Sequence, residues 1–116
     1  MLWLKNLWER MRPARLLLVH PDDSLPPLLP RRDVVVARDG DEDWAFGMHC
    51  PCGCGAVLEL MLVPEVRPHW RLSVDRQGRP TLFPSVWRDL GCGSHFWLRA
   101  GRVVWCSPKS FSQLRR

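Results

Sequence analysis

Hydrophobic positions follow two different patterns along this chain, and the change falls near residue 33. At the N-terminus, apolar residues recur at helical spacing, and they are Trp3, Leu4, Leu7, Trp8 and Met11. This spacing predicts a short amphipathic helix over residues 1–12, which Pro13 ends because proline has no backbone N–H to continue it. A helix of this kind packs on its own domain or docks on a partner or a membrane surface.

Residues 13–32 predict an extended connector rather than a further helix. Leu16 to Val19 could form a short strand, but the residues that follow are rich in proline, with Pro21, Pro26, Pro27 and Pro30. Proline lacks a donor and restricts the residue before it, so it interrupts regular structure.

From residue 33 onward, short apolar and alternating segments are separated by turn residues, which is typical of strands. The segments are Val34–Val36, Trp44–Met48, Ala56–Val63, Trp70–Val74, Thr81–Phe83, Phe96–Leu98 and Val103–Trp105. The sequences 75–78 and 99–102 each contain a glycine and predict hairpin turns. We therefore expect a mainly β, single-domain antiparallel fold over residues 33–107, preceded by the short helix and followed by a basic tail at 108–116.

Composition and charge indicate the kind of partner and the cellular compartment to expect. The chain has 116 residues, a formal net charge of +5 and a pI near 9.4, which favours acidic partners. No apolar run approaches the roughly 20 residues that span a bilayer, and the first apolar run is too short for a secretory signal. We therefore expect a cytoplasmic protein, in which clustered cysteines stay reduced and point to a metal rather than to disulfides.

Two cysteine-containing segments predict the metal site. The first is a glycine-rich turn, Cys50-Pro51-Cys52-Gly53-Cys54-Gly55, between two predicted strands, and the second is Cys92-Gly93-Ser94-His95. Thiolates and imidazole are zinc ligands, and four of them close a tetrahedral structural site. We expect Cys92 and His95 to bind with two of the three clustered cysteines, and the spacing does not choose which two. An iron–sulfur cluster is the alternative metal centre, although a Rieske arrangement would need a second histidine.

Other chemically active residues carry weaker signals. We expect Cys106 to be a buried structural thiol, His49 to support the cluster from beside it, and His20 and His69 to be solvated. Glu59 is the one carboxylate near the cluster that could act catalytically with zinc. No Ser-His-Asp motif, phosphate-binding loop or carboxylate pair can be assigned from the sequence.

Several motifs together resemble a family of small bacterial domains of unknown function. They are Cys-Pro-Cys-Gly-Cys-Gly at 50–55, Trp70-Arg71-Leu72, Leu82-Phe83-Pro84-Ser85-Val86, Cys92-Gly93-Ser94-His95-Phe96 and Val103-Val104-Trp105. The resemblance covers roughly residues 45–106 and departs from the family at Val86-Trp87. It implies a metal-binding domain, and some family members lie near genes for ubiquitin-like conjugation. It implies no established reaction.

These observations lead to three functional hypotheses. The first is a non-catalytic zinc module that binds a protein partner, as an accessory factor of a bacterial ubiquitin-like conjugation or phage-defence system. The second is a nucleic-acid-binding zinc module, because tryptophans and arginines alternate in the β region and the net charge is positive. The third is a metal-dependent hydrolase or an iron–sulfur redox protein.

Overall fold

The computed structural model describes residues 2–106, and it has one helix and nine strands in that range. The helix α1 spans Leu2–Met11. The strands are β1 (Leu17–His20), β2 (Val34–Asp39), β3 (Glu42–His49), β4 (Val57–Met61), β5 (Arg71–Val74), β6 (Pro80–Phe83), β7 (Val86–Trp87), β8 (His95–Arg99) and β9 (Arg102–Trp105). The mainly β fold with a short N-terminal helix, predicted from the sequence, is therefore confirmed. The predicted basic tail at 108–116 lies outside the described residues.

The largest sheet has four strands in the order β1-β2-β3-β4. β2, β3 and β4 pair antiparallel, whereas β1 pairs parallel to β2, with Leu17 opposite Val34. The connector segment thus supplies an edge strand, close to the short strand that the sequence allowed at Leu16 to Val19. The proline-rich stretch after β1 then packs on the sheet, where Leu25 and Leu29 lie so close to Gly47 that a Cβ there would meet Leu25 Cδ1 at 2.8 Å.

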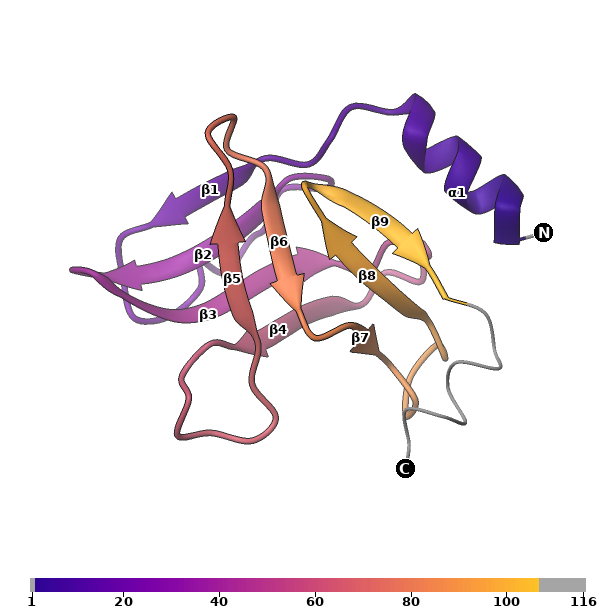
Figure 1. Cartoon of the computed structure of the whole chain (residues 1–116). Helices are drawn as coiled ribbons and strands as arrows, with labels where there is room; N and C mark the ends of the chain where they lie inside the picture. The colour runs from indigo at the N-terminus through magenta and orange to yellow at the C-terminus, as the bar shows by residue number, and fades with distance from the viewer. Residues whose placement is uncertain (1, 107–116) are drawn as a thin grey trace.

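Two smaller antiparallel units lie beside this sheet: the hairpin β5-β6 and the three-stranded sheet β7-β8-β9 (Figure 1). The turn predicted at 75–78 joins β5 to β6, and Asp75 holds it by accepting hydrogen bonds from the backbone N–H groups of Gln77 and Arg79, each at 2.9 Å. The turn predicted at 99–102 joins β8 to β9. Here Gly101 has a φ of +77° and lies against the Arg15 backbone, so only a residue without a side chain fits.

One hydrophobic core joins the three sheets. It is built from Val34, Val36, Phe46, Met48, Cys50, Leu58, Leu60, Leu62, Leu82, Val86, Phe96, Leu98 and Val103. The buried members come from every strand except β1 and β5, so their burial fixes how β6 and β8 sit against β3 and β4. This packing places the loop after β3 beside the loop before β8, and that junction carries the functional groups.

Candidate metal centre and Ser–His pair

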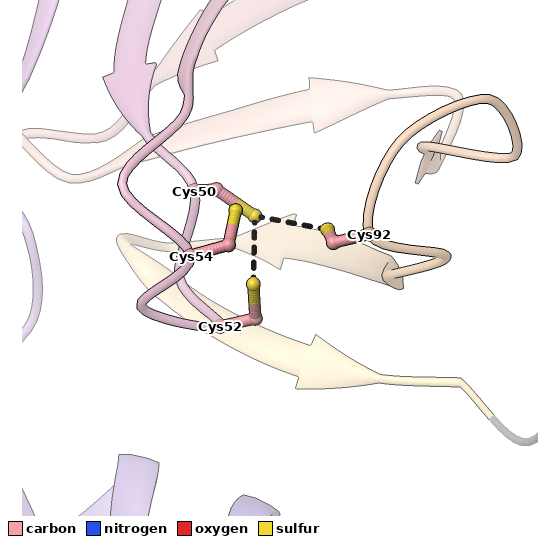
Figure 2. A group of neighbouring side chains, drawn as sticks. All are labelled: Cys50, Cys52, Cys54 and Cys92. Carbon is pink, nitrogen blue, oxygen red and sulfur yellow. Dashed lines mark hydrogen bonds between the residues drawn. The ribbon is translucent and has the colours of Figure 1, made fainter.

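Four cysteine thiols from two loops meet at one point (Figure 2). Cys50, Cys52 and Cys54 come from the turn that follows β3, and Cys92 comes from the loop that precedes β8. Their Sγ atoms all lie within 4.8 Å of one another; Cys50 Sγ is 3.3 Å from Cys52 Sγ and 3.6 Å from Cys92 Sγ. The prediction that clustered cysteines could hold a metal ion is therefore confirmed.

The turn after β3 is shaped to bring three thiols to one side. The Cys50 N–H donates to the Ala56 carbonyl at 2.9 Å, which closes the base of the turn, and the Gly53 N–H donates to the Cys50 carbonyl at 3.2 Å. Gly53 and Gly55 have φ angles of +86° and +87°, a region that a side chain disfavours. Gly53, between Cys52 and Cys54, and Gly55, directly after Cys54, are therefore favoured by the backbone path of the turn.

The second loop is folded around Arg88. Its carbonyl accepts hydrogen bonds from the N–H groups of Gly91 at 3.1 Å and Gly93 at 2.9 Å, and this positions Cys92. The Arg88 guanidinium lies 3.8 Å from both Cys54 Sγ and Cys92 Sγ. The thiols, Cys50 first among them, raise the pKa of Arg88, because a cation gains from negative charge that develops on sulfur.

The four thiols differ in how readily each loses its proton. Ser94 Oγ lies 3.0 Å from Cys92 Sγ, and the hydrogen bond between these two side chains lowers the pKa of Cys92 to about 6. Burial raises the pKa of Cys50 to about 12, because the charged form is desolvated. Burial also opposes ionisation of Cys52, but hydrogen bonds from Ser94 and the neighbouring thiols outweigh it and lower the pKa of Cys52. A bound cation would override the burial effect at Cys50 by stabilising its thiolate directly.

The geometry of this group fits a single tetrahedral ion. Four sulfurs, each 2.3 Å from one zinc, would be about 3.8 Å apart, and the observed separations bracket that value. An iron–sulfur cluster needs more room, because its cysteines are spread over two or more irons and not all of their sulfurs converge on one ion. Three of the thiols are exposed and one is buried, so the group sits at the edge of the core.

His95, which the spacing paired with Cys92 as a ligand, is not part of this group. It is the first residue of β8, it is 1% exposed, and its Nε2 lies 2.9 Å from Ser85 Oγ. The physical reason is the strand: Cys92 lies in the loop, whereas His95 already pairs with Trp87 of β7 and its ring belongs to the β7–β8 layer. The cysteine that the sequence left as spare is instead the fourth thiol of the group.

The Ser85–His95 pair is produced by strand pairing. Ser85 directly precedes β7, and Trp87 lies opposite His95, so Ser85 is the diagonal neighbour of His95 on the same face of the two strands. The Trp70 indole N–H donates to the Ser85 carbonyl at 3.2 Å and fixes the backbone there. Burial lowers the pKa of His95, so the ring is neutral near pH 7 and can accept a proton.

The remaining candidate residues belong neither to the thiol group nor to the Ser–His pair. Cys106 is outside the thiol group, and its backbone N–H donates to the His95 carbonyl at 2.9 Å. His49 Nε2 donates to the Leu29 carbonyl at 3.2 Å, and His69 Nδ1 contacts the Val66 carbonyl at 2.9 Å. Glu59 is exposed on β4. Ser85 is the residue whose chemical role the sequence did not suggest, although it lies in the Pro-Ser step that carried part of the family resemblance.

The pairing of a serine hydroxyl with a buried neutral histidine is the arrangement used by serine hydrolases. A family model described as "Bacterial ubiquitination-like system serine protease (BubE)" matches residues 21–106. The match covers most of the chain, and the chain belongs to this family. No curated protein and no solved structure matches it. The link to ubiquitin-like conjugation that the resemblance implied is thereby confirmed at the level of the family.

No helix among residues 2–106 is long and apolar enough to cross a membrane.

Proposed function

We propose that this chain is a serine peptidase that cleaves a protein substrate within a bacterial ubiquitination-like system, with Ser85 as the nucleophile and His95 as the general base. The observation that carries the proposal is the 2.9 Å contact between Ser85 Oγ and His95 Nε2. This distance lies within the range that proton transfer between a nucleophile and its base requires. The printed description of the family is the second support.

The reaction follows from the positions of these two groups. Ser85 Oγ attacks the carbonyl carbon of the scissile bond as its proton passes to His95 Nε2. The protonated imidazole then gives that proton to the leaving amine as the C–N bond breaks, which leaves an acyl-serine. Water, deprotonated by the same nitrogen, hydrolyses the ester and restores both residues. The burial that keeps His95 neutral suits it for the first step.

An open cleft whose lining includes Pro84, the residue before Ser85, offers room for a peptide. Its volume is about 600 Å³, and it is lined by Arg67, Pro68, His69, Arg71, Phe83 and Pro84. Phe83 and Pro84 are the two residues that precede the proposed nucleophile. Protein is thus the favoured substrate class, and the family description gives no support to the nucleic-acid alternative.

The metal in this proposal is zinc, held by Cys50, Cys52, Cys54 and Cys92 as a closed structural site. Zinc would supply cohesion between two loops, since four thiolates leave no position for water or substrate. The loop that carries Cys92 continues directly into Ser94 and His95, so fixing this loop fixes the base relative to Ser85. The interaction-module hypothesis assigned the metal this same structural role, and the Ser–His pair is what favours an enzyme over that hypothesis.

The test is cleavage of conjugates, or of a C-terminally extended precursor, made by the cognate ubiquitin-like system. We expect wild-type protein to release the ubiquitin-like protein and Ser85→Ala to be inactive. Ser73→Ala is the matched control, because Ser73 is exposed on β5 and lies outside both sites. Equal activity of Ser85→Ala and wild type, in preparations free of other peptidases, would rule out the proposed nucleophile.

A further inference from the structure

Helix α1 is attached to the domain by its polar side, the reverse of the usual arrangement for an amphipathic helix. Glu9 is 6% exposed, forms ion pairs with Arg15 and Arg32, and accepts a hydrogen bond from the Val103 N–H at 3.2 Å. Asn6 Oδ1 accepts from the Trp105 N–H at 2.9 Å. The helix is therefore fixed along the edge strand β9, where Figure 1 shows it.

The end of the helix is held in the same way. Arg102 Nη1 donates to the carbonyls of Glu9 at 2.9 Å and Arg12 at 2.5 Å, so a cation occupies the helix C-terminus, where it is most favourable. Arg15 N donates to the Gly101 carbonyl at 2.7 Å just beyond. These contacts leave the helix little freedom to turn its other side inward.

The side that faces solvent is apolar. Its residues are Trp3, Leu4, Leu7, Trp8 and Met11, which are 66%, 48%, 47%, 62% and 73% exposed, respectively. We call these five residues the α1 stripe. The sequence left open whether the helix packs on its own domain or docks elsewhere. In the structure the polar side of the helix packs on the domain, whereas the α1 stripe is exposed and can contact another surface.

The charge around the α1 stripe selects among its possible occupants. Lys5, Arg10 and Arg12 are exposed at the helix, whereas its one acid, Glu9, is buried against two arginines. Two copies of the chain joined through this stripe would bring these cations together, which disfavours a dimer. The occupant should instead be apolar within and anionic at its surface.

We propose that the α1 stripe binds in the interface of a bilayer that contains anionic phospholipid. Tryptophan, leucine and methionine on one side with lysine and arginine beside them is the composition of interfacial helices. Ten residues cannot span a bilayer, so the helix lies in the plane of the surface. Because the opposite side of α1 is fixed to β9, only the α1 stripe can make contact. A flat bilayer surface covers such a one-sided stripe better than a protein groove, which would have to enclose more of the helix.

This site is separate from the proposed peptidase site. The helix lies outside residues 21–106, which match the family, and it contributes neither Ser85 nor His95. Binding through the α1 stripe would place the enzyme at a membrane surface, where it would act on substrates located there. Basic side chains near an anionic leaflet each strengthen binding, and the tryptophans add apolar burial.

The test is sedimentation with vesicles of phosphatidylglycerol and phosphatidylcholine, compared with vesicles of phosphatidylcholine alone. We expect binding to the anionic vesicles that weakens in high salt, and little binding to the neutral ones. The double variant Trp3→Ser/Trp8→Ser should bind at least about tenfold more weakly. Leu28→Ser is the matched control, because Leu28 is an apolar side chain that is 86% exposed and lies outside the helix.

Both variants change exposed side chains, and circular dichroism and thiol-bound metal content verify that they are folded. The proposal is overturned if anionic vesicles fail to bind the wild-type protein, or if the double variant binds them as well as wild type does. It is equally overturned if the α1 stripe is required for binding a protein component of the conjugation system and the wild-type protein does not bind the vesicles.

Discussion

The thiol group and the Ser–His pair are close in sequence, with Cys92 three residues before His95 at the start of β8, yet they are built in different ways. Three of the four thiols come from one turn, and Gly53 and Gly55 set its path. The Ser–His pair instead depends on β7 and β8 pairing in one register. The first site is largely local and lies at the surface, whereas the second is tertiary and has a buried base. The two sites should therefore respond unequally to substitution. A change that disrupts the loop before β8 should impair both sites, whereas a change in Ser85 or His95 should impair only the Ser–His pair.

The largest effect is expected from loss of a thiol. Cys92→Ala should release the metal and unfold the β7–β9 region, because zinc binding at a structural site is worth about 10–16 kcal/mol and rivals the whole stability of a small domain. Metal analysis and thermal melting of freshly purified protein measure this, with about one zinc per chain expected in wild type. Cys106→Ala, which removes a thiol outside the group, should keep its metal. A stable, metal-free Cys92→Ala protein that retains activity would separate the two sites and remove the proposed link between them.

The next effect should be confined to catalysis. His95→Gln removes the base but keeps a polar side chain of similar size beside Ser85, so kcat/KM should fall by about 10²- to 10⁴-fold. Metal content should stay at the wild-type level, since His95 lies outside the thiol group. Steady-state kinetics and metal analysis of the same preparation decide this. Loss of zinc from a folded His95→Gln protein would mean that His95 is a ligand, as the Cys-x-x-His spacing first indicated.

A substitution in a third region, helix α1, should leave both the thiol group and the Ser–His pair intact. Glu9→Gln leaves Arg15 buried without its carboxylate, and removing one member of a buried ion pair typically costs about 3–5 kcal/mol. We expect faster hydrogen exchange in α1 with unchanged metal content and activity. Glu65→Gln, at an exposed carboxylate, is the control. Unchanged exchange in α1 would show that the Glu9 contacts do not hold the helix.

The smallest effect is in the pH profile. Burial lowers the pKa of His95 below 6.5, and the base works only when it is neutral. As the pH falls, kcat/KM should therefore hold to below pH 6.5 and decline only as it passes the lowered pKa. The unfolded chain takes up the proton near 6.5 whereas the folded chain does not, so stability should decrease as the pH falls below that value. An acid limb at or above 6.5 would contradict the buried, neutral base.

The contrast between the two sites also explains what could be predicted from the sequence. The hairpins around 75–78 and 99–102 were predictable because their turns carry local signals, and so was the meeting of the cysteines. The strand at Leu17–His20 is edge structure in a proline-rich region, and only its parallel pairing with Val34 and its neighbours makes it part of the sheet.

The Ser–His pair could not be predicted in the same way. Ser85 and His95 are ten residues apart, and their meeting depends on a two-residue strand, Val86–Trp87, which is too short to show a clear hydrophobic pattern. His95 was assigned to the metal because Cys-x-x-His spacing is a local signal, and local signals dominate when strand register is unknown. The reversed orientation of α1 was hidden for the same reason: its amphipathic pattern is plain, but only Arg15, Arg32 and Val103 make its polar side the inner one.

The central claim is that Ser85 is a nucleophile activated by His95, and covalent labelling tests it without knowledge of the substrate. A fluorophosphonate forms a bond to an activated serine oxygen and loses fluoride. Intact-mass and peptide mass spectrometry of the treated, metal-loaded protein should show one adduct on Ser85. The adduct should be absent from Ser85→Ala, strongly reduced in His95→Gln and unchanged in Ser73→Ala. An unlabelled wild-type protein with intact metal and fold, or an adduct that survives in Ser85→Ala, would contradict the account.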